Sequence, residues 1–248
     1  LLVPSSSGSG PDAIARLVAA RMGTLLSQQI VCDNRAGANG VIASELVARA
    51  APDGYTLLMT SGGHTTNPHM YRKLPYDPIA DFTPITQFIT SGGLVVVVTP
   101  SFGARTIAQL IEMARAAPGK IVYASAGVGN STHLAGEMFN QAAGVRLTHV
   151  PYKGGGPAII DVIGGQVPLM FASGAVSIPY VKSGRLRALG YTGPKRSEQL
   201  PDVPTLNESG LKGFEVTGWY GLYGPARLPS AVVNRLYETT RDAVRHPE

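Results

Sequence analysis

The chain has little charge, a single cysteine and no long hydrophobic run. Its longest uninterrupted aliphatic stretch, residues 94–98, is far shorter than the ~20 residues that a membrane-spanning helix needs, which argues against such a helix. Because Cys32 is the only cysteine, the sequence allows no internal disulfide bond and no pair of neighbouring cysteines for a metal site. Such scarcity suits cytosolic and exported proteins alike.

Charged residues account for only 15% of the chain, and 21 basic residues against 16 acidic ones leave a net charge of +5. The basic residues are scattered, without a run of five and without interleaved aromatic residues, so no nucleic-acid partner is predicted. Hydrophobic residues make up 44%, which is too many for a disordered chain. The composition indicates a folded, mildly positive protein that favours small anions.

Glycine and proline are abundant, with 30 and 19 residues, and divide the chain into short elements. Apolar strands alternate with amphipathic helices up to residue 60, and the same alternation restarts after Pro100. This order predicts an α/β fold of two lobes, each with a parallel sheet and helices on both faces. The predicted lobes are residues 1–99 plus 222–248 and residues 100–221, joined by crossing strands at a hinge. Predicted strands include 1–4, 29–33, 55–60, 94–98, 121–124, 147–150, 168–172, 186–191 and 214–223, and predicted helices begin near 12, 41, 107, 132, 158 and 230.

Four predicted strand-to-helix turns are rich in serine, glycine and threonine: residues 5–10, 61–66, 125–133 and 153–156. In parallel sheets such turns lie at the carboxyl ends of the strands, where ligands bind. Each turn presents backbone N–H groups and the positive end of a helix dipole, and its hydroxyl groups add further donors. Such turns bind a carboxylate or phosphate without a basic side chain. An anionic or small polar ligand is therefore predicted.

One of these turns also permits an enzyme hypothesis. Gly8, Gly10 and Ala13 follow the G-x-G-x-x-G/A pattern of dinucleotide-binding turns, and Asp33 ends the next predicted strand, where a ribose-binding acid would lie. Three serines precede the first glycine and Pro11 occupies the turn, which weakens the match. An NAD(P)-dependent oxidoreductase that uses the Gly8–Gly10 loop remains the alternative function.

Other catalytic patterns are weaker still, and no enzyme activity, metal or cofactor is predicted. His64 and His69 straddle a proline at a spacing that does not suit zinc. His133, in the first turn of a helix, is interpreted as a polar contact, and His149 as a structural strand residue. The lone tryptophan, Trp219, is equally compatible with core packing and with closing over a ligand.

Six ordered blocks along the chain resemble one known family. The blocks are VCDNRAGANG at 31–40, APDGYTLL at 51–58, KLPYDP at 73–78, DFTPI at 81–85, HVPYKGG at 149–155 and LPDVPT at 200–205. In these blocks the chain is similar to the Bug family of solute-binding proteins, the TctC-like extracytoplasmic receptors of tripartite tricarboxylate transporters.

The resemblance implies a bilobal periplasmic-binding-protein fold of the Venus-flytrap type, located in the periplasm. It implies a monomer that closes on a small organic carboxylate, aliphatic or aromatic, and delivers it to membrane permease subunits. In the family, strand-to-helix turns of both lobes grip the carboxylate. Together with the turns found above, this predicts the following ligand-binding residues: Ser5, Ser6, Ser7, Gly8, Ser9, Asp12, Ser61, Gly62, His64, Thr65, Asn67, Ser125, Ala126, Gly127, Gly129, Asn130, Ser131, His133, Tyr152, Gly154 and Trp219.

The first turn departs from the family pattern. Ser5 replaces an aromatic residue, and Ser6, Ser7 and Ser9 replace apolar or glycine positions, so we expect a more polar and roomier site, and the identity of the ligand is not carried over from any relative. Arg16 and Arg35 are candidates for a second ligand carboxylate. Family members also begin earlier, with a signal peptide, and continue further, so both ends of the full product are expected to be missing here.

Overall fold

The computed structural model describes residues 1–245 and divides the chain into two compact units, each with its own five-stranded mixed sheet. Unit 1 comprises residues 1–90 and the chain from Trp219 onward, and unit 2 comprises Ser91–Gly218. Within residues 1–245, no helix combines the length and the apolar character that crossing a membrane requires.

Unit 1 builds its sheet in the order β2-β1-β3-β10-β4. β1 pairs with β2 and β3 in parallel, and β10 pairs with β3 in the antiparallel sense. The elements of this unit are β1 (Leu2–Val3), α1 (Gly10–Leu26), β2 (Asp33–Asn34), the 3-10 turn η1 (Ala38–Gly40), α2 (Val41–Ala48), β3 (Leu58–Thr60), α3 (Gly63–Met70), β4 (Phe82–Ser91), β10 (Gly218–Pro225) and α8 (Ser230–Arg245).

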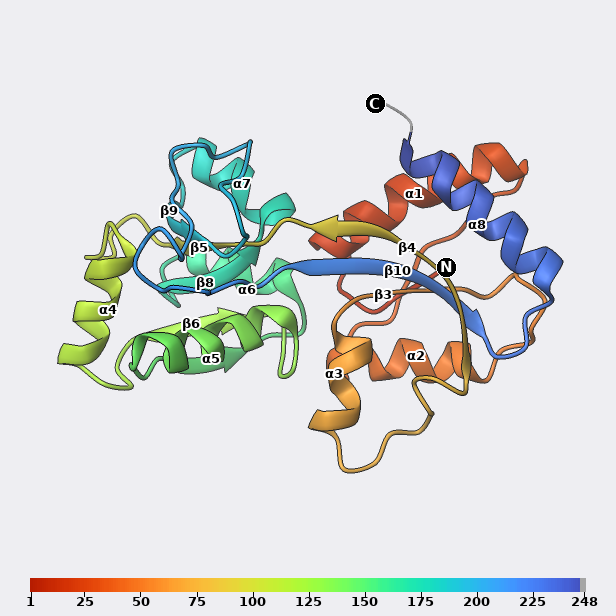
Figure 1. Cartoon of the computed structure of the whole chain (residues 1–248), viewed down its shortest axis with the longest axis horizontal. Coiled ribbons are helices and arrows are strands. Elements are labelled where there is room, and N and C mark those ends of the chain that lie inside the picture. The colour runs from red at the N-terminus through yellow and green to blue at the C-terminus, as the bar shows by residue number, and fades with distance from the viewer. Residues whose placement is uncertain (246–248) are drawn as a thin grey trace. The chain divides into compact units, whose positions relative to one another are not determined.

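Helices cover both faces of this sheet. Helices α1 and α8 lie side by side, with Met22 and Leu236 buried in one cluster together with Leu222 of β10 (Figure 1). Helix α2 buries Val47 against Leu58 of β3 in a second cluster. The sheet of unit 1 therefore lies between two packed layers of helices.

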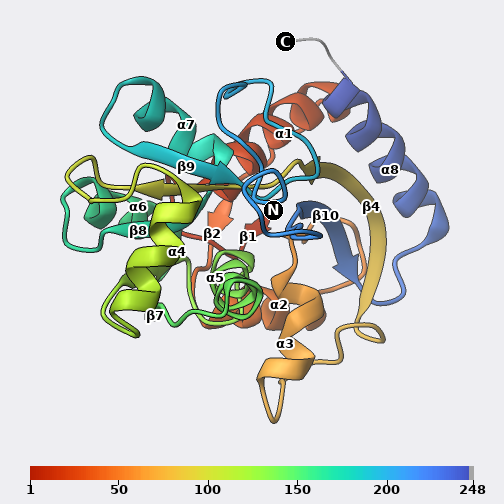
Figure 2. The same ribbon diagram turned by 60° about the vertical axis from the view of Figure 1, so that its left-hand side comes forward.

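Unit 2 repeats this layered arrangement with the strand order β7-β6-β8-β5-β9. β6 pairs in parallel with β7 and β8, whereas β5 is antiparallel to both β8 and β9. Helices α5 and α7 lie on opposite sides of the strands (Figures 1 and 2). The elements are β5 (Leu94–Val98), α4 (Ile107–Ala116), β6 (Val122–Ser125), α5 (Ser131–Ala143), β7 (Thr148–Pro151), α6 (Gly155–Ile163), β8 (Leu169–Ser173), α7 (Gly174–Lys182) and β9 (Arg187–Tyr191).

The aliphatic run of β5 lies between β8 and β9 in this sheet. Val96 and Val98 face one core cluster, which includes residues of α4 and α5, and Val95 and Val97 face the other, which includes residues of α6 and α7. A strand that is covered on both faces has no polar side, which explains the uninterrupted aliphatic sequence.

The observed lobe boundaries differ from the predicted ones. The compact units divide after Thr90 and after Gly218, not after residues 99 and 221. β5 belongs to unit 2 because its hydrogen-bonding partners are β8 and β9. Residues 246–248 of the predicted first lobe lie outside the described residues.

Three local predictions were also wrong. The sheets are mixed and not purely parallel, because β5 and β10 pair in the antiparallel sense. Only two residues of β2 form a strand, because β1 pairs with it only at Asp33 and Asn34. Helix α3 and strand β4 were missed: Pro68 obscured the helix, and Pro84 obscured a strand that lies at the sheet edge, where proline is tolerated.

Candidate functional site

The first strand-to-helix turn of unit 1 is organised by the carboxylate of Asp12. One oxygen accepts hydrogen bonds from the Gly8 N–H at 2.8 Å and from Nε of Arg16 at 3.0 Å, and the hydroxyl of Ser7 lies at 3.5 Å. The other oxygen accepts a hydrogen bond from Nδ2 of Asn34 at 2.9 Å. Asp12 is 3% exposed, so this negative charge is buried and compensated within the turn.

These contacts determine the protonation of the carboxyl group. Burial by itself raises the pKa of Asp12, but the hydrogen bonds from Arg16, Gly8 and Asn34 outweigh it and leave the pKa below its usual value. Gly8 and Asp12, both predicted to bind ligand, are therefore hydrogen-bonded to each other. Arg16 is committed to the same carboxylate, and Arg35 is paired with Asp33 at 3.0 Å.

The serines of this turn have different roles. Ser9 is the N-cap of α1: its hydroxyl oxygen accepts the Asp12 N–H, and its hydroxyl donates to that of Ser5 at 2.9 Å. The hydroxyl oxygen of Ser6 is buried and has no partner among residues 1–245. A buried hydroxyl without a partner is costly, so Ser6 is the serine of this turn with the strongest need for a ligand or a water molecule.

The second turn joins β3 to α3. Asn67 is buried and bound to Asn39: its Nδ2 donates to the Asn39 carbonyl at 3.1 Å, and its Oδ1 accepts from Asn39 Nδ2 at 2.9 Å. The Thr65 hydroxyl donates to the carbonyl of Gly62 at 2.9 Å. The Ser61 hydroxyl and the Gly62 N–H have no hydrogen-bond partner among the described residues. Of the predicted residues in this turn, these two offer unoccupied donors.

His64 lies in the core of unit 1, although it was predicted to bind ligand. It is 4% exposed, with its ring next to those of Tyr76, Phe82 and Tyr223. Its Nε2 lies 2.9 Å from the Pro78 carbonyl, which makes Nε2 the protonated donor and Nδ1 a buried, unpartnered acceptor. Burial lowers the pKa of His64, which is therefore neutral. His64 lies within the predicted turn 61–66, but helix α3 already begins at Gly63 and directs the ring inward.

The third turn joins β6 to α5 in unit 2. Asn130 is the N-cap of α5, with its Oδ1 accepting the Thr132 N–H at 3.1 Å, and the Ala126 N–H donates to the Thr132 hydroxyl at 2.8 Å. The Gly127 N–H donates to the buried Ser125 hydroxyl at 3.1 Å. The N–H groups of Ala126 and Gly127 are thus used within the turn. Nδ2 of Asn130 has no partner among the described residues, and the adjacent Ser131 hydroxyl has only a 3.4 Å contact with Asn130 Oδ1.

Two stacked histidines, His133 and His149, form hydrogen bonds with residues of this third turn. The rings of His133 and His149 lie 4.0 Å apart between centroids. Nδ1 of His133 accepts the Gly129 N–H at 3.1 Å, and Nε2 of His149 is hydrogen-bonded to the Ser125 hydroxyl. His149 was predicted to be only a structural strand residue, but it holds a predicted ligand residue. The signal that could have identified it is its place in the HVPYKGG block.

Burial lowers the pKa values of both histidines. The pKa of His149 falls to about 4, because burial and the neighbouring His133 outweigh the opposing effect of Glu137. The pKa of His133 is lowered by burial, again against Glu137. Glu137 itself accepts a 2.7 Å hydrogen bond from the Tyr123 hydroxyl, whose ring adjoins His149. The pair is therefore neutral at pH 7.

The remaining predicted residues are Tyr152, Gly154 and Trp219. The Tyr152 hydroxyl donates to Asp161 of α6 at 2.7 Å, and burial together with Asp161 raises the pKa of Tyr152 to about 12. Gly154 precedes α6 with φ 139°, a conformation that favours glycine. Trp219 is half-buried in β10, beside Gly221. None of these side chains offers a free hydroxyl to an anion.

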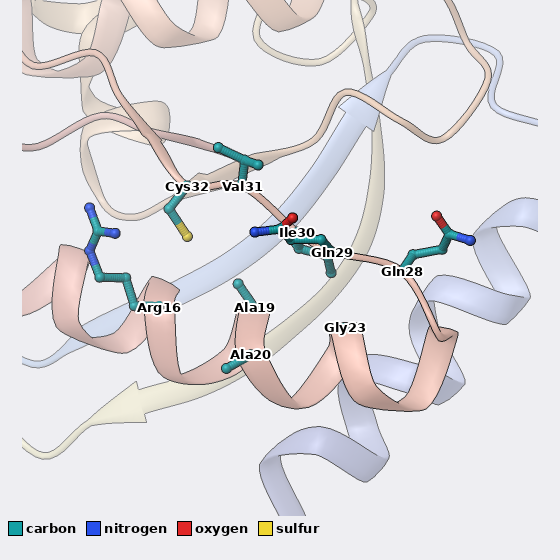
Figure 3. A pocket seen from close by; sticks show the side chains of 9 residues that line it. All are labelled: Arg16, Ala19, Ala20, Gly23, Gln28, Gln29, Ile30, Val31 and Cys32. Atoms are coloured by element: carbon teal, nitrogen blue, oxygen red, sulfur yellow. The ribbon is translucent and has the colours of Figure 1, made fainter.

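A groove of about 500 Å³ lies elsewhere in unit 1, between α1 and residues 28–32 (Figure 3). Arg16, Ala19, Ala20 and Gly23 line it on the helix side. The Cys32 side chain points toward the helix, and burial raises the pKa of its thiol. Of the residues named above as candidates for binding a ligand, only Arg16 lines the groove.

We expect Asp12→Asn to lower the free energy of unfolding by about 1–3 kcal/mol. The new amide group would turn its own N–H toward a donor whose hydrogen bond Asp12 now accepts, and that donor would lose its partner. Urea unfolding measures the loss. The matched control is Asp33→Asn, which removes the carboxylate of an exposed ion pair and is expected to change stability by less than about 1 kcal/mol. Equal losses in the two variants would contradict the central role of Asp12.

We expect stability to fall as the pH drops from 6.5 toward 4. His149 stays neutral in the folded protein until its pKa of about 4, whereas the unfolded chain takes up a proton near pH 6.5. The difference in melting temperature between pH 7.5 and pH 5.0 should be smaller in His149→Gln than in the unsubstituted protein. His69→Gln, at an exposed position, is the control and should leave the difference unchanged. An undiminished pH effect in His149→Gln would show that His149 does not carry it.

Comparison with known proteins places this geometry in context. Residues 14–248 match the family model of the tripartite tricarboxylate transporter family receptor, TctC. The chain is 42% identical over 248 residues to the UPF0065 protein in the tcbD-tcbE intergenic region of Pseudomonas sp. strain P51, covering all of this chain and 74% of that protein.

Solved structures agree with this family match. The periplasmic binding protein BugD is 36% identical with a TM-score of 0.94, and the alignment covers 99% of this chain and 82% of BugD. Rpa4515 from R. palustris with adipate is 37% identical with a TM-score of 0.93, covering 96% and 80%. MatC from Rhodopseudomonas palustris with bound malate is 32% identical with a TM-score of 0.93, covering 99% and 84%. The predicted bilobal periplasmic-binding-protein fold is thereby confirmed, and the chain belongs to the TctC family of receptors, the Bug-type periplasmic solute-binding proteins.

Proposed function

We propose that this receptor binds a small organic carboxylate through the strand-to-helix turns of both units. The proposal rests on one observation. These turns contain hydrogen-bond donors without partners, whereas the buried carboxylate of Asp12 already accepts hydrogen bonds from its neighbours. The Ser6 hydroxyl, the Ser61 hydroxyl and Nδ2 of Asn130 lack partners among the described residues, and Asp12 is saturated by donors. A turn of this kind attracts an anion and does not repel it.

Helix geometry supports the same ligand class. The three turns lead into α1, α3 and α5, whose first N–H groups carry the positive ends of the helix dipoles. An anion at a helix start is stabilised by these groups without a neighbouring lysine or arginine. Arg16 and Arg35, the two candidates for a second carboxylate, are paired with Asp12 and Asp33. We therefore assign recognition to hydroxyl and amide donors.

Relatives narrow the choice of first probes. Structures at 37% and 32% identity contain adipate and malate, which are both aliphatic dicarboxylates. The serines at positions 5, 6, 7 and 9 make the first turn polar, which favours a ligand that carries polar groups beyond one carboxylate. Aromatic acids stay within the proposed class, since nothing in the turns excludes a planar body.

The transport role follows from the family. We infer that the protein acts in the periplasm as a monomer, that ligand binding favours a closed form, and that the permease subunits of a tripartite tricarboxylate transporter recognise this form. A ligand shifts such an equilibrium only by its differential affinity for the closed state. No catalytic step is part of this proposal.

A thermal-shift panel tests the ligand class. It contains adipate, malate, citrate and benzoate, with amino acids, NAD and NADP for comparison. A ligand at 100 times its Kd stabilises the protein by about 2.7 kcal/mol, which corresponds to several degrees for a chain of this size. A shift with carboxylates alone supports the proposal. A shift with NAD or NADP alone overturns it in favour of the Gly8–Gly10 nucleotide hypothesis.

We expect Ser131→Ala to weaken binding of the carboxylate found in the panel by about 10–150-fold, the equivalent of one hydrogen bond to a charged group at about 1.5–3 kcal/mol. Isothermal titration calorimetry gives the ratio of Kd values. Ser230→Ala is the matched control, because Ser230 is likewise the first residue of its helix but lies outside the predicted turns. Unchanged affinity in Ser131→Ala would remove the third turn from the site.

A further inference from the structure

Thr192, directly after β9 in unit 2, makes an unusual set of hydrogen bonds. It is fully buried, and its hydroxyl accepts the Leu94 N–H at 2.7 Å and donates to the Val216 carbonyl at 2.6 Å. Its own backbone N–H donates to the Leu94 carbonyl at 2.9 Å, and its carbonyl accepts the Val216 N–H at 2.9 Å. One residue therefore satisfies four backbone groups of two other segments.

Those two segments are the passages by which the chain enters and leaves unit 2. The unit begins at Ser91 and ends at Gly218, so Leu94 and Val216 each lie within a few residues of a boundary. No other part of the chain links the units covalently, since the remainder of unit 2 is continuous between these points. Thr192 thus ties the incoming and outgoing passages to each other at one buried point.

Glycines bring the backbones at this point into direct contact. A Cβ at Gly93 would lie 2.5 Å from the Gly193 nitrogen, and a Cβ at Gly193 would overlap the Gly92 carbonyl oxygen. Gly93 also has φ 151°, which glycine adopts more readily than other residues. The backbone of Gly92 and Gly93 is therefore packed directly on that of Gly193, with no side chain between them. Only residues outside these contacts are left free to move.

We propose that Thr192 is a positioning residue for ligand-driven closure: it holds the two crossing passages together inside unit 2 and confines bending to residues 90–91 and Thr217, outside these contacts. The proposal rests on the proposed function, in which a carboxylate favours a closed form. The hydroxyl is essential to this role because it is both acceptor for Leu94 and donor to Val216. Serine retains both capacities, whereas valine has the same shape and neither.

The test compares Thr192→Val with Thr192→Ser and with the control Thr240→Val. Thr240 is equally buried, and its hydroxyl donates to the Leu236 carbonyl within α8. It belongs to unit 1, whereas Leu94 and Val216 belong to unit 2. Hydrogen exchange is measured on the ligand-free proteins for peptides covering 90–98 and 214–220. Affinity and dissociation rate are measured with adipate and with malate.

Thr192→Val should raise exchange at least ten-fold in those two peptides alone and weaken binding at least five-fold, with faster dissociation. Thr192→Ser should stay close to the unsubstituted protein in both measurements. Thr240→Val should lose stability without either local effect. If Thr192→Val shows unchanged exchange in both peptides, or an unchanged Kd despite faster exchange, the positioning role is refuted.

Two further arms keep the outcomes separate. If the unsubstituted protein binds none of the carboxylates in the panel, the proposed function fails, and the exchange measurement alone decides whether Thr192 ties the passages. If Thr192→Val does not fold, Gly193→Ala serves instead, because its Cβ would overlap the backbone carbonyl oxygen of Gly92 and push the incoming passage away from the residue after Thr192. Unchanged affinity and exchange in Gly193→Ala would then overturn the proposal.

Discussion

The buried carboxylate of Asp12 is the charge around which the first turn of unit 1 is built. A buried charge is tolerated only when hydrogen bonds and opposite charge replace the water it has lost, and here Gly8, Arg16 and Asn34 supply them. This requirement ties the turn after β1 to α1 and to β2. It also accounts for the pairing of Arg16 with the carboxylate of the turn itself.

In the other two turns, too, some polar residues form hydrogen bonds with each other, whereas neighbouring donors have no partner. Asn67 joins α3 to the segment before α2 through Asn39, and Thr132 and Asn130 join the start of α5 to the turn that precedes it. Because these groups satisfy one another, the neighbouring hydroxyl and amide donors are held in place without being consumed. A rigid set of unoccupied donors is what the recognition of a small anion requires, since little conformational entropy is lost on binding.

Unit 2 packs its strands between two hydrophobic clusters. β5 is covered on both faces, and Thr192 fastens the start of that strand to the segment that leads out of the unit. Buried backbone groups that are not paired within a sheet need other partners, and a single threonine supplies them here. The hydrogen bonds of Thr192 therefore join the two segments through which the chain enters and leaves unit 2.

The sequence by itself determined the α/β class, most of the helices, the location of the polar turns and the family. Periodicity and turn residues are local properties, so helix α4 begins at its predicted residue, Ile107, and the motif blocks identify the family without any structure. The side-chain directions were not accessible in this way. Only the tertiary structure decided that His64 points into an aromatic core, that Asn67 is held by Asn39, and that His149 supports Ser125. Each of these depends on residues distant in the chain, and hydrogen-bond partners across such distances are chosen by packing, which no local pattern encodes.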